Sequence, residues 1–331
     1  MINLSNLSSF CSIFLLHLSL VTFAGAQENR SAAPANLPGN GLAQHSFVYT
    51  GEAKARKIFI IRNGKVDWEY EETTGRGEIS DVVMLSNGNI LVAHQFAVKL
   101  ISPAKVVLWN LDAPAGTEIH TALPIGFDHV LYVQNGAVPS VNVVNIKTGT
   151  INLSFPLKAN PKDVHLQFRR ARLTPQGTLL VAHKDQDKVS EYNDKGEEIW
   201  SISLPEVWGA EQLANGHILI STHFGVREVT RDKQVVFSLT REDMPDYKVY
   251  NWQLCWRLPN GNTVFNNWIN SWSQPDLIAK GDAAQLIEVD PQKRVVWALR
   301  SWNMPDLGPA TAIQFLDKRT YPERVHFGSI K

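Results

Sequence analysis

The chain of 331 residues carries 32 Lys plus Arg against 32 Asp plus Glu, and without a basic run this balance excludes a nucleic acid or an anionic membrane held by bulk charge. Ten Trp, 21 Gly and 17 Pro beside only two Cys exclude a disulfide scaffold and indicate a turn-rich β protein. The length allows one large domain or two ordinary ones.

The N-terminal segment has the pattern of a secretion signal. Residues 11–26 form an apolar stretch that ends in Ala24-Gly25-Ala26, the small-residue pattern of a cleavage site. The stretch is shorter than the roughly 20 apolar residues that a membrane span requires. We therefore expect residues 1–26 to be a cleaved signal peptide that leaves no transmembrane segment, and the mature protein to be secreted or periplasmic. Residues 27–45 are polar and rich in Ala, Pro and Gly, which predicts a linker.

A repeat organises the sequence from residue 46 onward. Each copy has an apolar segment, a short polar turn and a β-favouring segment that ends near a large apolar residue, as in IFIIRNGKVDWEY (residues 58–70). The six copies centre on Trp68, Trp109, Leu153, Trp200, Phe237 and Trp297. Spacings of 37 to 47 residues, with a last one of 60, are typical of four-stranded propeller blades. The longer interval predicts an insertion at residues 271–284.

A second hairpin alternates with the first. An Asn-Gly or similar turn joins two β-rich runs in VVMLSNGNILVAH (residues 82–94), in ARLTPQGTLLVAH (residues 171–183) and in three further segments at 121–134, 210–223 and 254–268. Asn-Gly between β-rich runs is the strongest short-range signal for a hairpin. Each period therefore holds two hairpins, or four strands.

The two ends of the repeat region complement each other. Residues 46–70 supply three strands without an innermost strand, and residues 310–317 supply an innermost strand without a hairpin. Joining them completes one blade and leaves no sheet edge open. We predict an all-β fold: a six-bladed β-propeller of four-stranded antiparallel blades over residues 46–317, closed by the C-terminal innermost strand joining the N-terminal strands. Residues 318–331 are predicted to form a C-terminal tail.

The recurring Trp residues predict blade-to-blade packing. Trp68, Trp109, Trp200 and Trp297 each fall on an outermost strand, where burial of an indole contributes about 2 to 3 kcal/mol. This apolar–turn–Trp repeat resembles the PQQ-like, or tryptophan-docking, β-propeller superfamily of bacterial secreted proteins.

The resemblance implies a fold more than an activity. Quinone-dependent dehydrogenases of that group resemble larger, eight-bladed rings and often carry a vicinal Cys pair; this sequence has neither, so pyrroloquinoline quinone is not expected as a cofactor. A more distant likeness is to arylsulfotransferase-type six-bladed propellers, in which an active-site His acts beside further His and Arg residues.

One mouth of the channel is the expected ligand site, because the starts of innermost strands and the ends of second strands converge there. Aligning the repeats places His94, Gln134, His183, Thr222 with His223, and Asn267 with Trp268 at the ends of second strands. A solvated loop role is the alternative for each His. His94, Gln134 and His183 offer nitrogen and oxygen ligands that suit a divalent metal such as Mn, and they form the predicted metal site.

The segment FRRAR (residues 168–172) begins an innermost strand. Strand alternation sends Arg170 and Arg172 to the same face, where they either anchor a carboxylate, sulfate or phosphate or form a salt bridge to Asp81, Glu118 or Glu211. Residues 251–272 carry four Trp and several Asn. This density favours a sugar platform, because sugar rings offer apolar faces and a rim of hydroxyls; a thicker core is the alternative.

His, Arg and Trp at one mouth favour a uronic or sulfated saccharide as ligand. A lyase reaction fits: a His abstracts the proton α to a carboxylate that Arg or a metal neutralises. The alternatives are a non-catalytic propeller that binds a glycan or a protein, and a sulfuryl transferase with a His nucleophile. If the protein is an enzyme, we expect a carbohydrate-active lyase or hydrolase with a small-molecule or oligosaccharide ligand.

The candidate residues follow from these alignments. The catalytic candidates are His120, His183, Arg170 and Arg172. The substrate-binding candidates are Glu118, Glu211, Gln253, Asn267 and Trp268. The remaining histidines of the mature chain, His45, His129, His165, His217 and His326, are expected to be structural.

Overall fold

The structure is a computed structural model that describes residues 31–52, 56–74, 76–160 and 162–331. Six four-stranded antiparallel sheets form the blades of a six-bladed β-propeller, so the predicted fold is confirmed. The predicted signal peptide lies outside the described residues. Among the described residues, no helix is long and apolar enough to cross a membrane.

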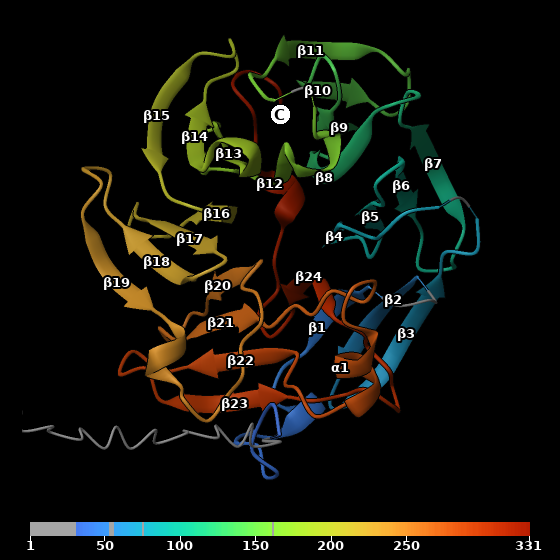
Figure 1. The fold of residues 1–331 in the computed structure, drawn as a ribbon. Coiled ribbons are helices and arrows are strands. Elements are labelled where there is room, and N and C mark those ends of the chain that lie inside the picture. Colours follow the sequence, from blue (N-terminus) through green and yellow to red (C-terminus); the bar gives the residue numbers. More distant parts are fainter. Residues whose placement is uncertain (1–30, 53–55, 75, 161) are drawn as a thin grey trace, which may run out of the picture. The chain divides into compact units, whose positions relative to one another are not determined.

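Each blade is a meander that runs from the channel to the rim (Figure 1). In order from the innermost strand, blade 1 has β24 (Ala310–Phe315), β1 (Phe47–Gly51), β2 (Lys57–Arg62) and β3 (Lys65–Glu71); blade 2 has β4 (Asp81–Met84), β5 (Ile90–Ala93), β6 (Ala97–Ile101) and β7 (Val107–Asp112); blade 3 has β8 (Glu118–Ile125), β9 (His129–Asn135), β10 (Ser140–Asn145) and β11 (Ile151–Pro156). Blade 4 has β12 (Phe168–Leu173), β13 (Leu179–His183), β14 (Lys188–Tyr192) and β15 (Glu198–Ser203); blade 5 has β16 (Val207–Gln212), β17 (Ile218–Thr222), β18 (Gly225–Val229) and β19 (Val235–Leu239); blade 6 has β20 (Cys255–Arg257), β21 (Thr263–Asn266), β22 (Leu286–Val289) and β23 (Val295–Leu299).

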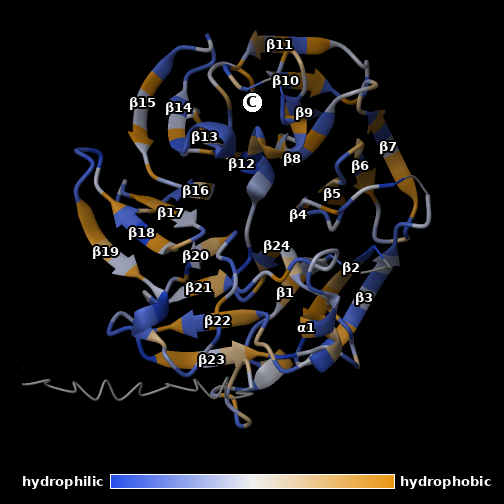
Figure 2. Cartoon of the chain, in the orientation of Figure 1, coloured by the Kyte–Doolittle hydropathy of each residue, from blue (hydrophilic) through white to orange (hydrophobic). Residues whose placement is uncertain are grey.

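Blade 1 closes the ring as the repeat predicts. The C-terminal strand β24 pairs with β1, with Phe47 opposite Phe315 and Tyr49 opposite Ile313. The predicted insertion contains the short helix α1 (Pro275–Lys280). Short 3₁₀ turns also occur in the connections, among them η2 (Val164–Leu166) and η3 (Lys184–Gln186). Figure 2 shows hydrophobic residues in every blade, alternating with hydrophilic ones along the strands.

Two of the outer Trp residues, Trp68 and Trp200, join neighbouring blades through their indole N–H groups as well as by packing. Trp68 of blade 1 donates to the Pro103 carbonyl in blade 2 (2.8 Å), and Trp200 of blade 4 donates to the Arg231 carbonyl in blade 5 (2.8 Å). Each acceptor lies in the turn between the third and fourth strands of the next blade. The docking role assigned to these residues thus has a polar component, since the turn carbonyl gains a partner.

Residues 31–45, part of the predicted linker, pack against the propeller. Trp297 of blade 6 donates to the Gly41 carbonyl (2.8 Å), and Ala32 and Ala33 are buried. Gly39 has φ of +83°, and a Cβ there would lie 2.6 Å from Cδ1 of Trp297. Residues 31–45 are held in place because the Gly41 carbonyl accepts the hydrogen bond from Trp297. For Trp68 and Trp200, the corresponding acceptor is a carbonyl in a turn of the next blade.

Candidate functional site

Six equivalent residues ring one mouth of the channel. Just after the C-terminal end of the innermost strand, a backbone hydrogen bond connects it to the second strand of the blade. Examples are Leu85 N to Asn89 O (2.8 Å) and Thr174 N to Thr178 O (2.9 Å). Counting five residues back from this point in each blade gives one position per blade, which we call the mouth ring. Its members are Ser80, His120, Arg169, Trp208, Gln253 and Thr311.

β-Bulges turn several of these side chains toward the mouth. The pairing register shifts around His120 in β8, around Arg169 in β12 and around Trp208 in β16, so that each is the extra residue of its strand. A bulge re-aims the side chain that it carries, and bulges are common beside functional sites. Three consecutive blades therefore present an imidazole, a guanidinium and an indole from the same position.

Glu118 binds two imidazoles at this mouth. Its Oε2 lies 2.8 Å from Nε2 of His120 and 2.8 Å from Nδ1 of His165, which is carried by η2. Burial raises the pKa of the Glu118 carboxyl, but the hydrogen bonds from both imidazoles outweigh it and hold this pKa well below its usual range. Glu118 is therefore a permanent anion that orients both rings.

Arg169 lies against both rings. Its Nη1 is 3.1 Å from Nε2 of His165 and 3.2 Å from Nδ1 of His120. A guanidinium only donates hydrogen bonds, so Nε2 of His165 carries a lone pair while Nδ1 donates to Glu118. His165 thus presents its basic nitrogen beside a fixed cation, and its side chain is 44% exposed, whereas that of His120 is 1% exposed.

Glu78 places a second carboxylate beside Arg169. The Arg169 Nη2 atom donates to the Glu78 carboxylate. Burial opposes ionisation of Glu78, but Arg169 and His120 hold its pKa well below the usual range. The Arg169 guanidinium also lies 5.7 Å from the ring of Trp208, whose indole N–H has no hydrogen-bond partner among the described residues.

Glu52 and Trp268 form the opposite side of the mouth. The Trp268 indole N–H donates to Glu52 (2.8 Å), and the Trp268 ring lies 6.3 Å from that of Trp208. Burial, together with the nearby charge of Glu78, raises the pKa of Glu52 to about 7. Glu52 can therefore carry a proton near neutral pH, unlike Glu78 and Glu118.

A metal ion would find a different ligand set from the predicted one. Nitrogen and oxygen atoms of Glu118, His120 and His165 lie within 4.8 Å of one another, and this is the group of three His, Cys, Asp or Glu residues found in the described chain. Two imidazoles and a carboxylate suit several divalent transition metals. Arg169 already lies against both imidazoles, so its charge opposes a second cation there.

The predicted metal ligands are not gathered at the mouth. His183 is buried, lies edge-on to Phe168 (4.9 Å) and has Nε2 3.0 Å from the Tyr192 hydroxyl. Burial lowers its pKa to about 4, which leaves a neutral core histidine. His94 is also buried and lines a separate pocket with residues of β6 and β7, while Gln134 lies in β9 opposite Ser140 of β10. Strand ends share a register, but their side chains face different blade interfaces.

The predicted Arg pair holds a carboxylate of the protein itself. The Asp81 carboxylate, 1% exposed, accepts from Arg170 (2.5 Å) and from Arg172 (2.8 and 3.0 Å). Arg170 also donates to the Thr311 carbonyl (2.8 Å). Of the two alternatives, the inter-blade salt bridge to Asp81 is the contact present, and neither guanidinium belongs to the mouth ring.

The predicted substrate-binding residues divide among three places. Glu118, Gln253 and Trp268 lie at the mouth with His120. Asn267 is buried, and its side-chain amide forms hydrogen bonds with the backbone of Tyr250, Lys248 and Ala284. Glu211 lines a cavity farther along the channel with Arg172.

The sequence did not mark His165, Glu78, Glu52 or Trp208 as site residues, and it gave the role in anion binding to Arg170 and Arg172 rather than to Arg169. His165 and Glu52 lie in connections that carry no repeat signal. Arg169 and Trp208 share a register with His120, and an alignment of inner strands shows this, but regular alternation assigns bulged residues to the wrong face.

No protein-family model matches the sequence, and no curated protein matches it. The chain is similar to a solved protein of unknown function from Bacteroides caccae, with 24% identity and a TM-score of 0.70 over 81% of this chain and 98% of that one. It is also similar to a catalytically inactive variant of virginiamycin B lyase from Staphylococcus aureus with quinupristin (9% identity, TM-score 0.55, 80% of this chain and 88% of that one). A streptogramin B lyase structure matches similarly (12% identity, TM-score 0.53, 83% and 85%). These likenesses support the propeller fold alone.

Proposed function

We propose that this propeller binds an anionic saccharide at the channel mouth and cleaves it by β-elimination. The observation that carries the proposal is the position of Arg169 beside the unprotonated Nε2 of His165, 3.1 Å away. In the free protein Arg169 donates to this nitrogen. A substrate carboxylate that takes the guanidinium as its partner releases the Nε2 lone pair beside the substrate, and neutralising that carboxylate makes the proton on its α-carbon easier to remove.

The remaining groups complete the elimination. His165 Nε2 takes the proton on the carbon α to the uronate carboxylate. The electron pair forms the C=C bond as the bond from the β-carbon to the glycosidic oxygen breaks. That oxygen takes the proton of Glu52, whose pKa near 7 keeps part of the population protonated. Solvent exchange then returns His165 and Glu52 to their starting states.

The indoles of Trp208 and Trp268 supply a binding surface. Their rings are 6.3 Å apart at the mouth, and aromatic faces pack well against the C–H faces of sugars. A saccharide explains why aromatic and charged residues share this mouth. Lyases among the structural neighbours are compatible with this reaction class, and the proposal rests on the site rather than on them.

Sulfuryl transfer through His120 has less support. The ring of His120 is 1% exposed, and its nitrogens face Ser80 (2.9 Å) and Glu118 (2.8 Å). A nucleophile needs a free lone pair directed at the substrate. His120 instead orients Glu118, and we assign it a positioning role.

The test is to incubate the protein with uronate-containing and sulfated oligosaccharides and to detect the conjugated unsaturated product by absorbance and mass spectrometry. Arg169→Lys keeps the charge but loses the planar fork, so we expect KM to rise at least about tenfold while the melting temperature holds. Arg227→Lys, on β18 of blade 5, is the matched control. Saccharide binding without product would favour a non-catalytic propeller.

A further inference from the structure

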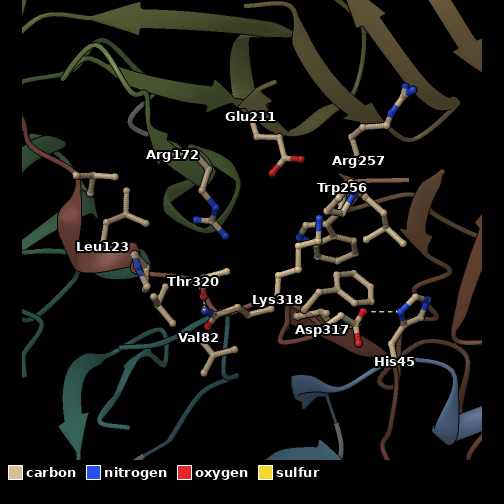
Figure 3. Close-up of a pocket in the computed structure, with 18 of the residues that line it drawn as sticks. His45, Val82, Leu123, Arg172, Glu211, Trp256, Arg257, Asp317, Lys318 and Thr320 are labelled. Atoms are coloured by element: carbon tan, nitrogen blue, oxygen red, sulfur yellow. Dashed lines mark hydrogen bonds and ion pairs between the residues drawn. The ribbon is translucent and has the colours of Figure 1, made fainter. Parts of the chain in front are cut away.

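A cavity lies on the channel axis, at the opposite end of the channel from the mouth ring. Counting two residues back from the same backbone hydrogen bond selects Val83, Leu123, Arg172, Glu211, Trp256 and Gln314, one from each innermost strand, and all six line it. Its volume is about 720 Å³, within the range of small-molecule sites. Figure 3 shows Arg172 and Glu211 pointing into the same space from adjacent blades.

A strap, residues 317–327, covers this cavity. It leaves β24 and crosses the ring toward blades 3 and 4 (Figure 1). Asp317 holds its start by accepting from Ser46 N (2.8 Å). Farther along, the Glu323 carbonyl accepts from Gly126 N (2.8 Å), and Phe327 is fully buried. These contacts hold the strap in place near both of its ends. Its residues Lys318, Thr320 and Val325 form one wall of the cavity.

The walls are predominantly apolar. Val82, Leu123 and Ile313 line the cavity from three blades, and Trp256 adds an aromatic wall beside Phe315, 5.9 Å between ring centroids. A site of this size that is apolar with a few converging polar groups is the usual form of a small-molecule site.

Asp317 also lines the cavity, but its carboxylate accepts from His45 (2.6 Å) and from Ser46 N (2.8 Å). The other charged groups leave an excess of positive charge. Arg170 and Arg172 share the single carboxylate of Asp81, so one positive charge of the three groups is uncompensated. Lys318 is exposed and makes no ion pair within the described part of the chain. Burial raises the pKa of Glu211 to about 7, so this carboxyl offsets the cations only in part at neutral pH.

We propose that the axial cavity binds an amphiphilic organic anion, with its apolar body against Leu123, Ile313 and Trp256 and its acidic group near Lys318 and Arg172. The site is separate from the mouth: the Asp81 salt bridge lies between them along the innermost strands. It goes beyond the proposed reaction and uses none of the residues assigned to it.

The test compares two fluorescent probes with the same apolar body. 8-Anilinonaphthalene-1-sulfonate carries a negative charge, and 1-anilinonaphthalene is uncharged. We expect one bound sulfonate per chain with an affinity at least about tenfold above that of the uncharged probe. Equal affinities, or no saturable one-to-one binding, would overturn the proposal.

Matched variants locate the site. Lys318→Glu should weaken the sulfonate about tenfold and leave the uncharged probe unchanged. Lys195→Glu makes the same change in net charge at an exposed turn between β14 and β15, and should leave both affinities within about twofold. Equal weakening by both substitutions would contradict a specific contact.

A cavity-filling variant supplies the second measurement. Leu123→Trp should abolish binding of both probes while the melting temperature shows that the chain still folds; unchanged binding in the folded variant would place the probe elsewhere. His165→Ala should leave probe binding unchanged, so failure of the proposed lyase reaction and failure of this proposal give different results.

Discussion

At the scale of single residues, the character of the site comes from unequal environments of three carboxyl groups. Glu118 and Glu78 are held ionised by imidazoles and by Arg169. Among the described residues, the side chains that donate to Glu52 are the Trp268 indole and the Ser271 hydroxyl, and Glu52 lies near the like charge of Glu78. Pushing the pKa values of neighbouring groups apart is how one site keeps both a proton donor and fixed anions at the same pH.

The raised pKa of Glu52 makes stability depend on pH. Between the unfolded pKa of 4.5 and the folded pKa of about 7, the unfolded chain loses its proton first, so this group lowers the stability of the folded state as pH rises through that window. The loss levels off above pH 7 at about 3 kcal/mol. Glu52→Gln removes it, so urea denaturation should show the variant more stable than the wild type at pH 8 and similar at pH 4. Glu197→Gln, at an exposed turn, should show no such difference; equal pH profiles for Glu52→Gln and the wild type would contradict burial as the cause.

At the scale of elements, the strands were predictable and the bulges were not. Alternating hairpins with Asn-Gly turns predict four strands per period, and the closing pair β24–β1 follows from counting incomplete blades. A bulge inserts one residue into a strand, and no composition signal marks it. Glu118, His120 and Arg169 all lie at starts of innermost strands that the sequence locates. Regular alternation nevertheless gave the anion-binding role to Arg170 and Arg172, whose guanidinium groups bind Asp81 instead.

The docking role of the outer Trp residues predicts unequal effects of truncation. Trp200→Ala removes an indole packed against blade 5 together with its hydrogen bond to the Arg231 carbonyl, and should lower the free energy of unfolding by about 2 to 4 kcal/mol. Trp272→Ala, at a 64% exposed side chain, should change it by less than about 0.5 kcal/mol. Chemical denaturation measures both, and similar losses would contradict the docking role.

The strap gives a second prediction at this scale. Phe327 is fully buried and lies 6.2 Å from Phe155 in the core between blades 3 and 4. Phe327→Ala should therefore cost about 3 to 5 kcal/mol, although it lies close to the C-terminal end of the chain. Met304→Ala, at an 89% exposed side chain, is the control. If the two variants are equally stable, the strap is not fixed as described.

At the scale of the whole propeller, equivalent positions on the innermost strands build two different sites. The mouth ring carries His120, Arg169 and Trp208, and the ring three residues farther along carries Leu123, Arg172 and Glu211. The repeat therefore supplies the frame, while single residues in each blade supply the chemistry. This explains why the sequence predicts the architecture well and the site only in part.

The proposed elimination is tested by measuring the turnover of uronate-containing oligosaccharides by the wild type and by His165→Ala, followed as absorbance of the unsaturated product. We predict product with the wild type, and a rate at least about 100-fold lower in the variant, because a positioned general base contributes that much or more. The melting temperature should be unchanged, since the His165 side chain is 44% exposed. A wild type that forms no unsaturated product from any uronate, or a variant as active as the wild type, would contradict β-elimination with His165 as the base.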